Sequence, residues 1–234
     1  MKKIEELYNN SGLPGPRGNL TLLYKFAYNC SNEEIAECFK YDSADISNSP
    51  DEFVLMCGIV AYGVSKTREI KMAASHLRKY ASHKSWRVRE AVAIGFQEIA
   101  VVNMEEVVEE LIGWLDGNAY EQRAVVATLC EPKLLKKYNN MPKILHILVE
   151  LILSYNKISE KLTEAQGTLK KTLGYGLSVA IVHAPEEGKI IFENLSVEEN
   201  KHIHWILRNN LKKKRLSKMD EEWVKAMSVK LEAN

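Results

Sequence analysis

The apolar residues of this chain recur at the spacing of a helix with one buried face. Starting from Val88, they fall at intervals of three and four residues, and the segments that begin at Met104 and Leu169 repeat the pattern. An alternation of period two is hard to find, and only six prolines and twelve glycines interrupt the chain. This periodicity predicts an all-α fold.

The helical pattern itself repeats every 34 residues. One step of the repeat pairs Trp86, Arg89, Val92 and Ala93 with Tyr120, Arg123, Val126 and Ala127. Further steps of 34 lead back from Val88 to Val54 and Leu20, and another joins Leu169 to Ile203. One step is longer by thirteen residues, which places an insertion near residues 131–143, where Pro132 must end a helix. We count six units of about 34 residues.

In each unit the helix described above is preceded by a weaker one, so the chain is predicted to be a row of helix pairs. The weaker helix is the first of each pair and the helix described above is the second. The expected first helices cover residues 33–40, 67–80, 104–115, 143–155 and 188–195, and a capping helix covers about 220–231. Ser31 with Glu34 and Ser196 with Glu199 fit capping boxes, and Ser49 precedes a proline at a helix start. Such pairs bury their apolar faces by stacking. We therefore expect one domain over residues 1–234, a right-handed α-solenoid.

The segment Trp-Arg-Val-Arg-Glu-Ala at residues 86–91, opening a second helix, resembles HEAT repeats. The spaced Trp, Leu-Gly and Tyr pattern of tetratricopeptide repeats is not found in register, so the HEAT-like reading is preferred. Residues 13–20, which read Leu-Pro-Gly-Pro-Arg-Gly-Asn-Leu, together with the rest of the chain look like an uncharacterised bacterial group of HEAT-repeat proteins. This resemblance implies a small stand-alone array and no particular activity.

In HEAT arrays the second helices line the concave surface, so the resemblance implies a row of side chains along a groove. The candidate binding residues in and beside that row are Arg89, Arg123, Lys170, His204, Trp205 and Arg208. Cationic side chains of this kind hold phosphate or an acidic peptide. Two alternatives stay open. Arg89 and Arg123 could instead bond to a neighbouring repeat, and Trp86 and Trp205 could fill the seam between repeats rather than stack on a base.

Charge is balanced overall, with 32 basic and 31 acidic residues, but it is unevenly spread. Residues 66–89 carry a net +7, residues 98–116 a net −6 and residues 201–230 a net +6. The densest run, Lys-Lys-Lys-Arg at 212–215, suits either a solvated helix end or contact with nucleic acid. The blocks indicate patches that steer an anionic partner.

Sequence motifs of catalysis and of metal or cofactor binding are not found. His202 and His204 are two residues apart and point in nearly opposite directions on a helix, so they do not share a metal easily. Cys30, Cys38, Cys57 and Cys130 form no C-x-x-C pair and are expected to be free, buried thiols. Without an apolar leader or an apolar run of membrane length, we expect a cytoplasmic protein that does not enter the membrane and needs no cofactor or metal.

The chain also resembles, at the level of the fold, the HEAT-like DNA alkylation repair glycosylases, which hold DNA in a basic concave groove. Their Trp-Trp-Asp cluster has no counterpart here, since Trp114-Leu115-Asp116 is the nearest string and belongs to a first helix. No catalytic residue is carried over. The leading expectation is a non-enzymatic scaffold that binds a protein or peptide on its concave face, and the alternative is a DNA-binding protein that uses the basic row. A role in cofactor attachment or enzyme assembly is a third option that no residue selects.

Overall fold

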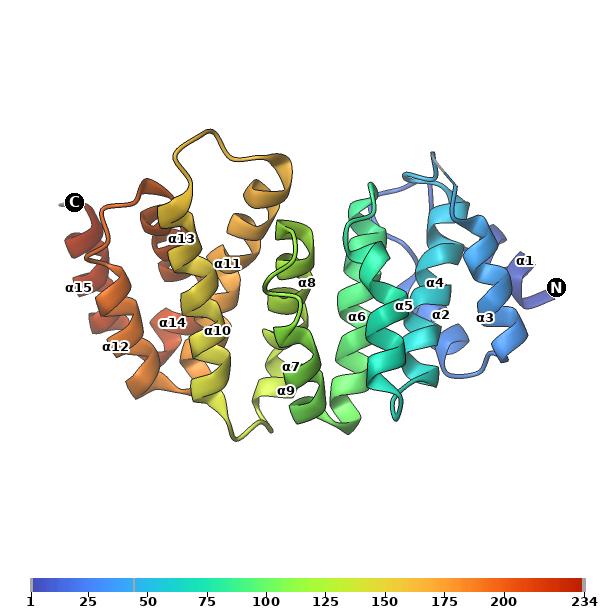
Figure 1. The fold of residues 1–234 in the computed structure, drawn as a ribbon, viewed down its shortest axis with the longest axis horizontal. Helices are drawn as coiled ribbons and strands as arrows, with labels where there is room; N and C mark the ends of the chain where they lie inside the picture. The colour runs from blue at the N-terminus through green and yellow to red at the C-terminus, as the bar shows by residue number, and fades with distance from the viewer. Residues whose placement is uncertain (1, 44, 233–234) are drawn as a thin grey trace. The chain divides into compact units, whose positions relative to one another are not determined.

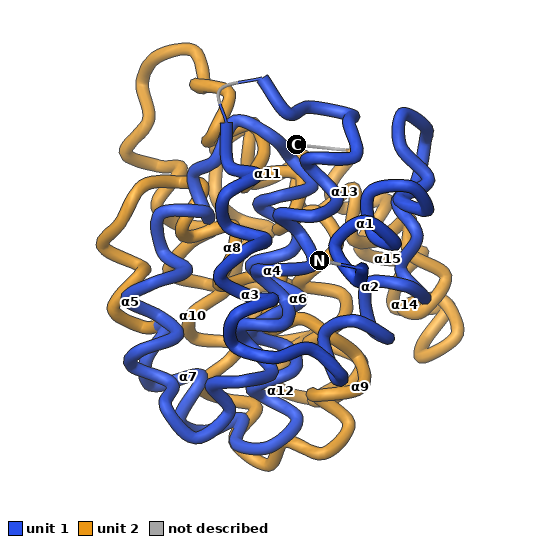
Figure 2. Tube along the Cα trace, turned by 90° about the vertical axis from the view of Figure 1, so that its right-hand side faces the viewer, with its two compact units in different colours: residues 1–111 blue, residues 112–234 orange. Residues whose placement is uncertain are grey.

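The computed structural model describes residues 2–43 and 45–232, and all regular secondary structure in those ranges is helical (Figure 1). The all-α prediction is thus confirmed. The chain divides into two compact units, residues 1–111 and 112–234, which Figure 2 shows in separate colours. None of the helices in the described ranges is both long and apolar enough to cross a membrane.

The first unit is built around α4 (Pro50–Ser65), an almost entirely buried helix. The helices that pack around α4 are α1 (Lys2–Asn9), α2 (Leu20–Ala27), α3 (Asn32–Cys38) with the short η1 (Phe39–Tyr41), and α6 (Trp86–Val102). Helix α5 (Ile70–Ala81) packs on α6. Helices α4 and α6 approach closely where Gly63 meets Gly95, since a Cβ on Gly63 would lie 2.6 Å from the Gly95 carbonyl oxygen. Helix α7 (Met104–Ile112) ends at the boundary of the unit.

In the second unit α11 (Glu164–His183) takes the central place. It packs against α8 (Ala119–Leu129), α9 (Pro132–Leu135), α10 (Met141–Leu153), α12 (Pro185–Leu195), α13 (Lys201–Leu211) and α14 (Lys214–Met219). Helix α10 runs on into η2 (Ser154–Lys157), and α15 (Glu221–Glu232) packs on α13 and α14. Buried Asn210 joins α13 to α11: its Oδ1 accepts from the Ser178 N–H at 2.8 Å, and its Nδ2 donates to the Leu173 carbonyl at 2.9 Å.

The positions of the predicted helices agree with the structure. The six segments spaced by the repeat are α2, α4, α6, α8, α11 and α13, and the predicted first helices are α3, α5, α7, α10 and α12. The expected capping segment is α15. Helix α8 ends at Leu129, just before Pro132, as predicted. The insertion near 131–143 holds α9, which begins with Pro132, and the loop that leads into α10.

Two of the three predicted helix starts are confirmed and one is wrong. Ser31 forms a capping box with Glu34, and the Ser49 side chain accepts from the Glu52 N–H at the start of α4. Ser196 does not begin a helix, because its backbone N–H closes the last turn of α12 and its hydroxyl donates to the Glu193 carbonyl at 2.6 Å. Asn200 caps α13 instead, accepting from the N–H groups of its first turn.

Candidate functional site

Arg89 is buried in the first unit and forms hydrogen bonds with backbone carbonyls of that unit. It is only 6% exposed, and its Nη1 donates to the carbonyl oxygens of His83 at 2.6 Å and Lys84 at 2.9 Å, in the turn that precedes α6. A guanidinium held by two backbone acceptors ties that turn to the helix. This is a structural role within the first unit.

The other charged groups at the start of α6 are also paired. Glu52 is fully buried and accepts hydrogen bonds from Arg87 Nη1 at 3.2 Å, from the Asn48 N–H at 3.0 Å and from the Ser85 hydroxyl. Arg87 Nη2 donates to the Gly15 carbonyl at 2.7 Å. Trp86, in contrast, is 54% exposed, with the Arg87 guanidinium 4.7 Å from its ring centroid. Trp86 is therefore an exposed ring at the start of α6.

In the second unit Lys170 of α11 and Trp205 of α13 lie together. The Lys170 ammonium lies 4.7 Å from the centroid of the Trp205 ring, a cation–π contact. Trp205 is half-buried, and its edge packs on α11 at Gly174, where a Cβ would lie 3.0 Å from its Cζ3. Burial lowers the pKa of Lys170, and the ammonium groups of Lys201 and Lys171 lower it further. Arg123 of α8 is half-buried in the same unit.

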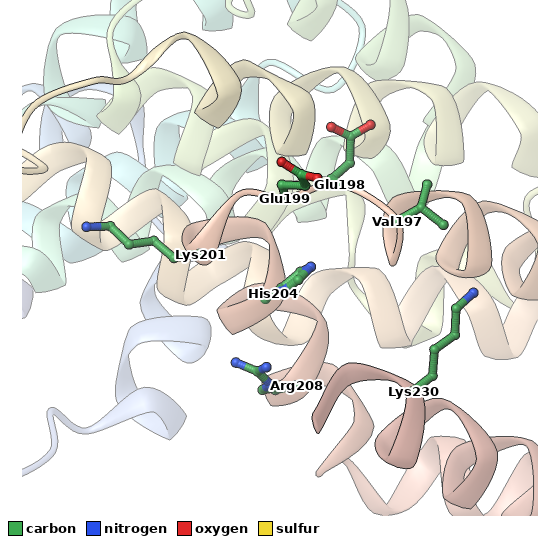
Figure 3. A pocket seen from close by; sticks show the side chains of 7 residues that line it. All are labelled: Val197, Glu198, Glu199, Lys201, His204, Arg208 and Lys230. Atoms are coloured by element: carbon green, nitrogen blue, oxygen red, sulfur yellow. The ribbon is translucent and has the colours of Figure 1, made fainter. Parts of the chain in front are cut away.

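His204 and Arg208 lie one turn apart on α13 and line a pocket of about 730 Å³ (Figure 3). The remaining lining side chains come from the α12–α13 loop, from the start of α13 and from α15: Val197, Glu198, Glu199, Lys201 and Lys230. In Figure 3 the two glutamates lie above His204 and Arg208 lies below it, and Lys230 stands to the right with its ammonium about level with His204. The pocket therefore presents both signs of charge.

His204 is the buried polar group of this pocket. The residue is 7% exposed, and its Nε2 is buried with no hydrogen-bond partner among residues 2–43 and 45–232. An unpartnered buried nitrogen costs free energy, since its hydration is lost and nothing replaces it.

The walls of the pocket are held in place on both sides. Arg208 Nη2 donates to the Leu231 carbonyl in the last turn of α15, which fixes the guanidinium next to Lys230. Asn156 Nδ2 donates to Glu198 at 2.8 Å, and Asn200 Nδ2 donates to the Tyr155 carbonyl at 2.9 Å, so the loop between α12 and α13 is anchored on η2. A prearranged pocket loses less entropy on binding.

Comparison of the chain with family models, with curated proteins and with solved structures finds no match. The function therefore has to be inferred from the pocket and its surroundings. Among the described residues, no group of three or more His, Cys, Asp or Glu side chains is arranged to hold a metal ion.

The 34-residue spacing placed Lys170, His204 and Arg208 on neighbouring helices, but it missed five of the seven residues that line the pocket. The sequence pattern predicts a capping box of Ser196 with Glu199 and a terminal capping helix that contains Lys230, and it indicates no role for Glu198. The i, i+4 spacing of His204 and Arg208 was the available signal for a shared face of α13. No local pattern indicates that α15 returns across this face, because that contact joins residues more than twenty positions apart.

Proposed function

We propose that this chain is a HEAT-like α-solenoid that acts as an interaction module and binds a peptide segment of a protein partner. The solenoid assignment is supported by the order of packing within each unit. In the first unit α4 packs on both α2 and α6, and in the second α11 packs on both α8 and α13. Such contacts between successive second helices are what a stack of helix pairs requires. The count of six repeats and the single continuous domain belong to the same proposal.

The observation that carries the peptide assignment is the mixed charge of the pocket on α13. Arg208 and Lys230 attract a carboxylate, whereas Glu198 and Glu199 attract a basic side chain or an amide N–H. Peptides offer both kinds of group within a few residues.

Nucleic acid is the second candidate, and the cationic surface around Lys170 favours it. Lys170 and Lys201 lie near enough for their charges to interact, and Trp205 provides an aromatic ring beside them. Two features weaken this candidate. Glu198 and Glu199 would repel a phosphate backbone that enters the pocket, and the ring of Trp205 is already in contact with Lys170 and α11.

A selection from a random peptide library on the intact protein tests the proposal. We expect the enriched peptides to carry an acidic and a basic residue a few positions apart, and Arg208→Glu to weaken their binding about tenfold or more. Lys212→Glu is the matched control, because Lys212 is an exposed cation outside the pocket lining. Peptides that bind both variants equally well would contradict the peptide site.

A gel-shift titration at two salt concentrations tests the second candidate. Several phosphate contacts would make the affinity fall steeply with salt. Salt-dependent binding that Lys170→Gln and Lys201→Gln weaken, together with an empty peptide selection, would replace the peptide proposal with the nucleic-acid one.

A further inference from the structure

Two tyrosine rings from neighbouring segments of the first unit lie close together. Tyr8 belongs to α1 and Tyr41 to η1, which continues α3, and α1 packs against α3 (Figure 1). The ring centroids lie 6.4 Å apart and the ring planes are tilted by 48°, so the two rings form a wedge. Tyr8 is 40% exposed and Tyr41 is half-buried. Both tyrosines therefore reach the surface.

Both tyrosines line a pocket of about 460 Å³. In the part of the chain that the structure describes, its other lining residues are Ile4, Glu5 and Glu37. Ile4 and Glu5 lie four and three positions before Tyr8, so the three share a face of α1. Glu37 lies four positions before Tyr41 on the neighbouring segment. The volume is within the range of small-molecule sites.

The lining of this pocket is negatively charged. Among the described residues it contains two carboxylates and no cationic side chain. Glu5 is exposed and has no hydrogen-bond or ion-pair partner in those same parts of the chain, whereas Glu37 pairs with Lys40 at 2.6 Å. Burial raises the pKa of Tyr41, and the charges of Glu37 and Asp51 raise it further. Anionic surroundings of this kind stabilise a nearby cation.

We propose that this pocket binds a methylated ammonium group in the wedge between Tyr8 and Tyr41. A cation is attracted to an aromatic face within about 6 Å of the ring centroid, and the wedge offers positions that meet this condition for both rings. Glu5 supplies a free counter-charge, and an anionic ligand would be repelled.

The other cation to consider at this site is a metal ion. In the described ranges no group of three or more His, Cys, Asp or Glu side chains is arranged to hold one, whereas two rings and a carboxylate suit an organic cation. All lining residues belong to the first unit, so the proposal is independent of the peptide pocket on α13.

The test compares choline with 3,3-dimethyl-1-butanol, which has the same shape but carries a carbon atom in place of the charged nitrogen. We expect choline to bind the intact protein about tenfold more tightly and to shift the ring signals of Tyr8 and Tyr41 in an NMR titration. Equal affinities, tighter binding of the alcohol, no binding of choline, or unmoved ring signals at saturation would overturn the proposal.

Variants of Tyr8 separate the ring from its hydroxyl. Tyr8→Phe keeps the aromatic face and should keep the preference for choline, whereas Tyr8→Leu should lose it. Tyr28→Leu is the matched control, because Tyr28 is an exposed tyrosine of the same unit outside the pocket lining, and it should bind choline like the parent. A preference that survives in Tyr8→Leu, or that Tyr8→Phe abolishes, would overturn the assignment.

Variants of the charged residues should act in opposite directions. Glu5→Gln should weaken choline binding about threefold, and Lys40→Gln should strengthen it, because Glu37 then loses its competing cation. The same choline affinity in both variants would overturn the electrostatic argument. N-acetyl-trimethyllysinamide distinguishes the source of the cation: tighter binding than choline points to a methylated lysine of a partner protein, and weaker binding points to a free small molecule.

Discussion

The two units of the chain use their charged residues in different ways. In the first unit Glu52, Arg87 and Arg89 are buried, and each is satisfied by side-chain or backbone partners of the same unit. In the second unit Arg208 and Lys230 are exposed and line an open pocket beside a histidine nitrogen that has no partner. A basic block in the sequence can thus become a buried network or an exposed pocket lining, depending on how the helices pack around it.

The largest effect is expected from breaking the buried pair of the first unit. Glu52→Gln keeps the shape of the side chain but leaves the buried Arg87 without its counter-ion, so the free energy of unfolding should fall by about 3–5 kcal/mol. Urea denaturation of the intact protein measures this. Glu37→Gln, which removes the exposed pair with Lys40, should cost under about 1 kcal/mol. Equal losses in the two variants would show that the Glu52 network is not a structural element.

A smaller loss is expected from the Asn210 contact in the second unit. Asn210→Leu conserves the approximate volume but leaves the Ser178 N–H and the Leu173 carbonyl without this partner at the α11–α13 interface. We expect the free energy of unfolding to fall by about 1–3 kcal/mol in the same urea experiment. Asn209→Leu is the neighbouring control, because the side chain of Asn209 bonds only within α13, to the Trp205 carbonyl. A variant as stable as the parent would contradict the role of Asn210.

Cysteine labelling distinguishes the two units directly. Cys57 lies buried in the first unit and Cys130 buried in the second, and burial raises the pKa of Cys130 to about 12. Both thiols should react with a thiol reagent only when their surroundings open, whereas half-buried Cys30 should react first. Mass spectrometry of the labelled peptides should show faster labelling of Cys57 in Glu52→Gln. An unchanged labelling rate of Cys57 would show that the Glu52 network does not stabilise the first unit.

The smallest effect is a loss of stability in mild acid. Burial lowers the pKa of His76 in the first unit and of His183 in the second below the ordinary value of 6.5. The unfolded chain therefore binds more protons than the folded one as the pH falls through 6.5, so stability is full above that pH and declines below it. Urea midpoints between pH 7.5 and 5.5 measure the decline. This decline should be shallower in His183→Gln and unchanged in His146→Gln. A urea midpoint that rises as the pH falls would contradict the predicted direction of the effect.

The sequence predicted the helices well, because their positions follow from local patterns. The apolar period located the helices, and the hydroxyls of Ser31 and Ser49 marked two starts correctly. The helix start predicted at Ser196 was wrong, because a Ser followed three residues later by Glu also occurs at the end of a helix. Asn200 provides the actual cap at the start of α13. Local patterns do not decide between two such residues when both lie near a boundary.

The candidate site could be predicted only in part, because its partners are distant along the chain. His204 and Arg208 follow from the repeat, but the contact of Arg208 with the end of α15 and the pairing of Arg87 with Glu52 depend on how the helices pack. Residue type and repeat spacing placed both Arg89 and Arg208 among the candidate binding residues. Only the folded chain reveals that Arg89 is buried and Arg208 is exposed.

The most direct test of the central claim is the affinity of one selected mixed-charge peptide for four proteins: the parent, Arg208→Gln, Glu199→Gln and Lys212→Gln. Calorimetry should show that the two pocket variants each weaken binding about tenfold and that the control binds like the parent. Equal binding by all four proteins, or loss only in Lys212→Gln, would show that the pocket on α13 is not the binding site.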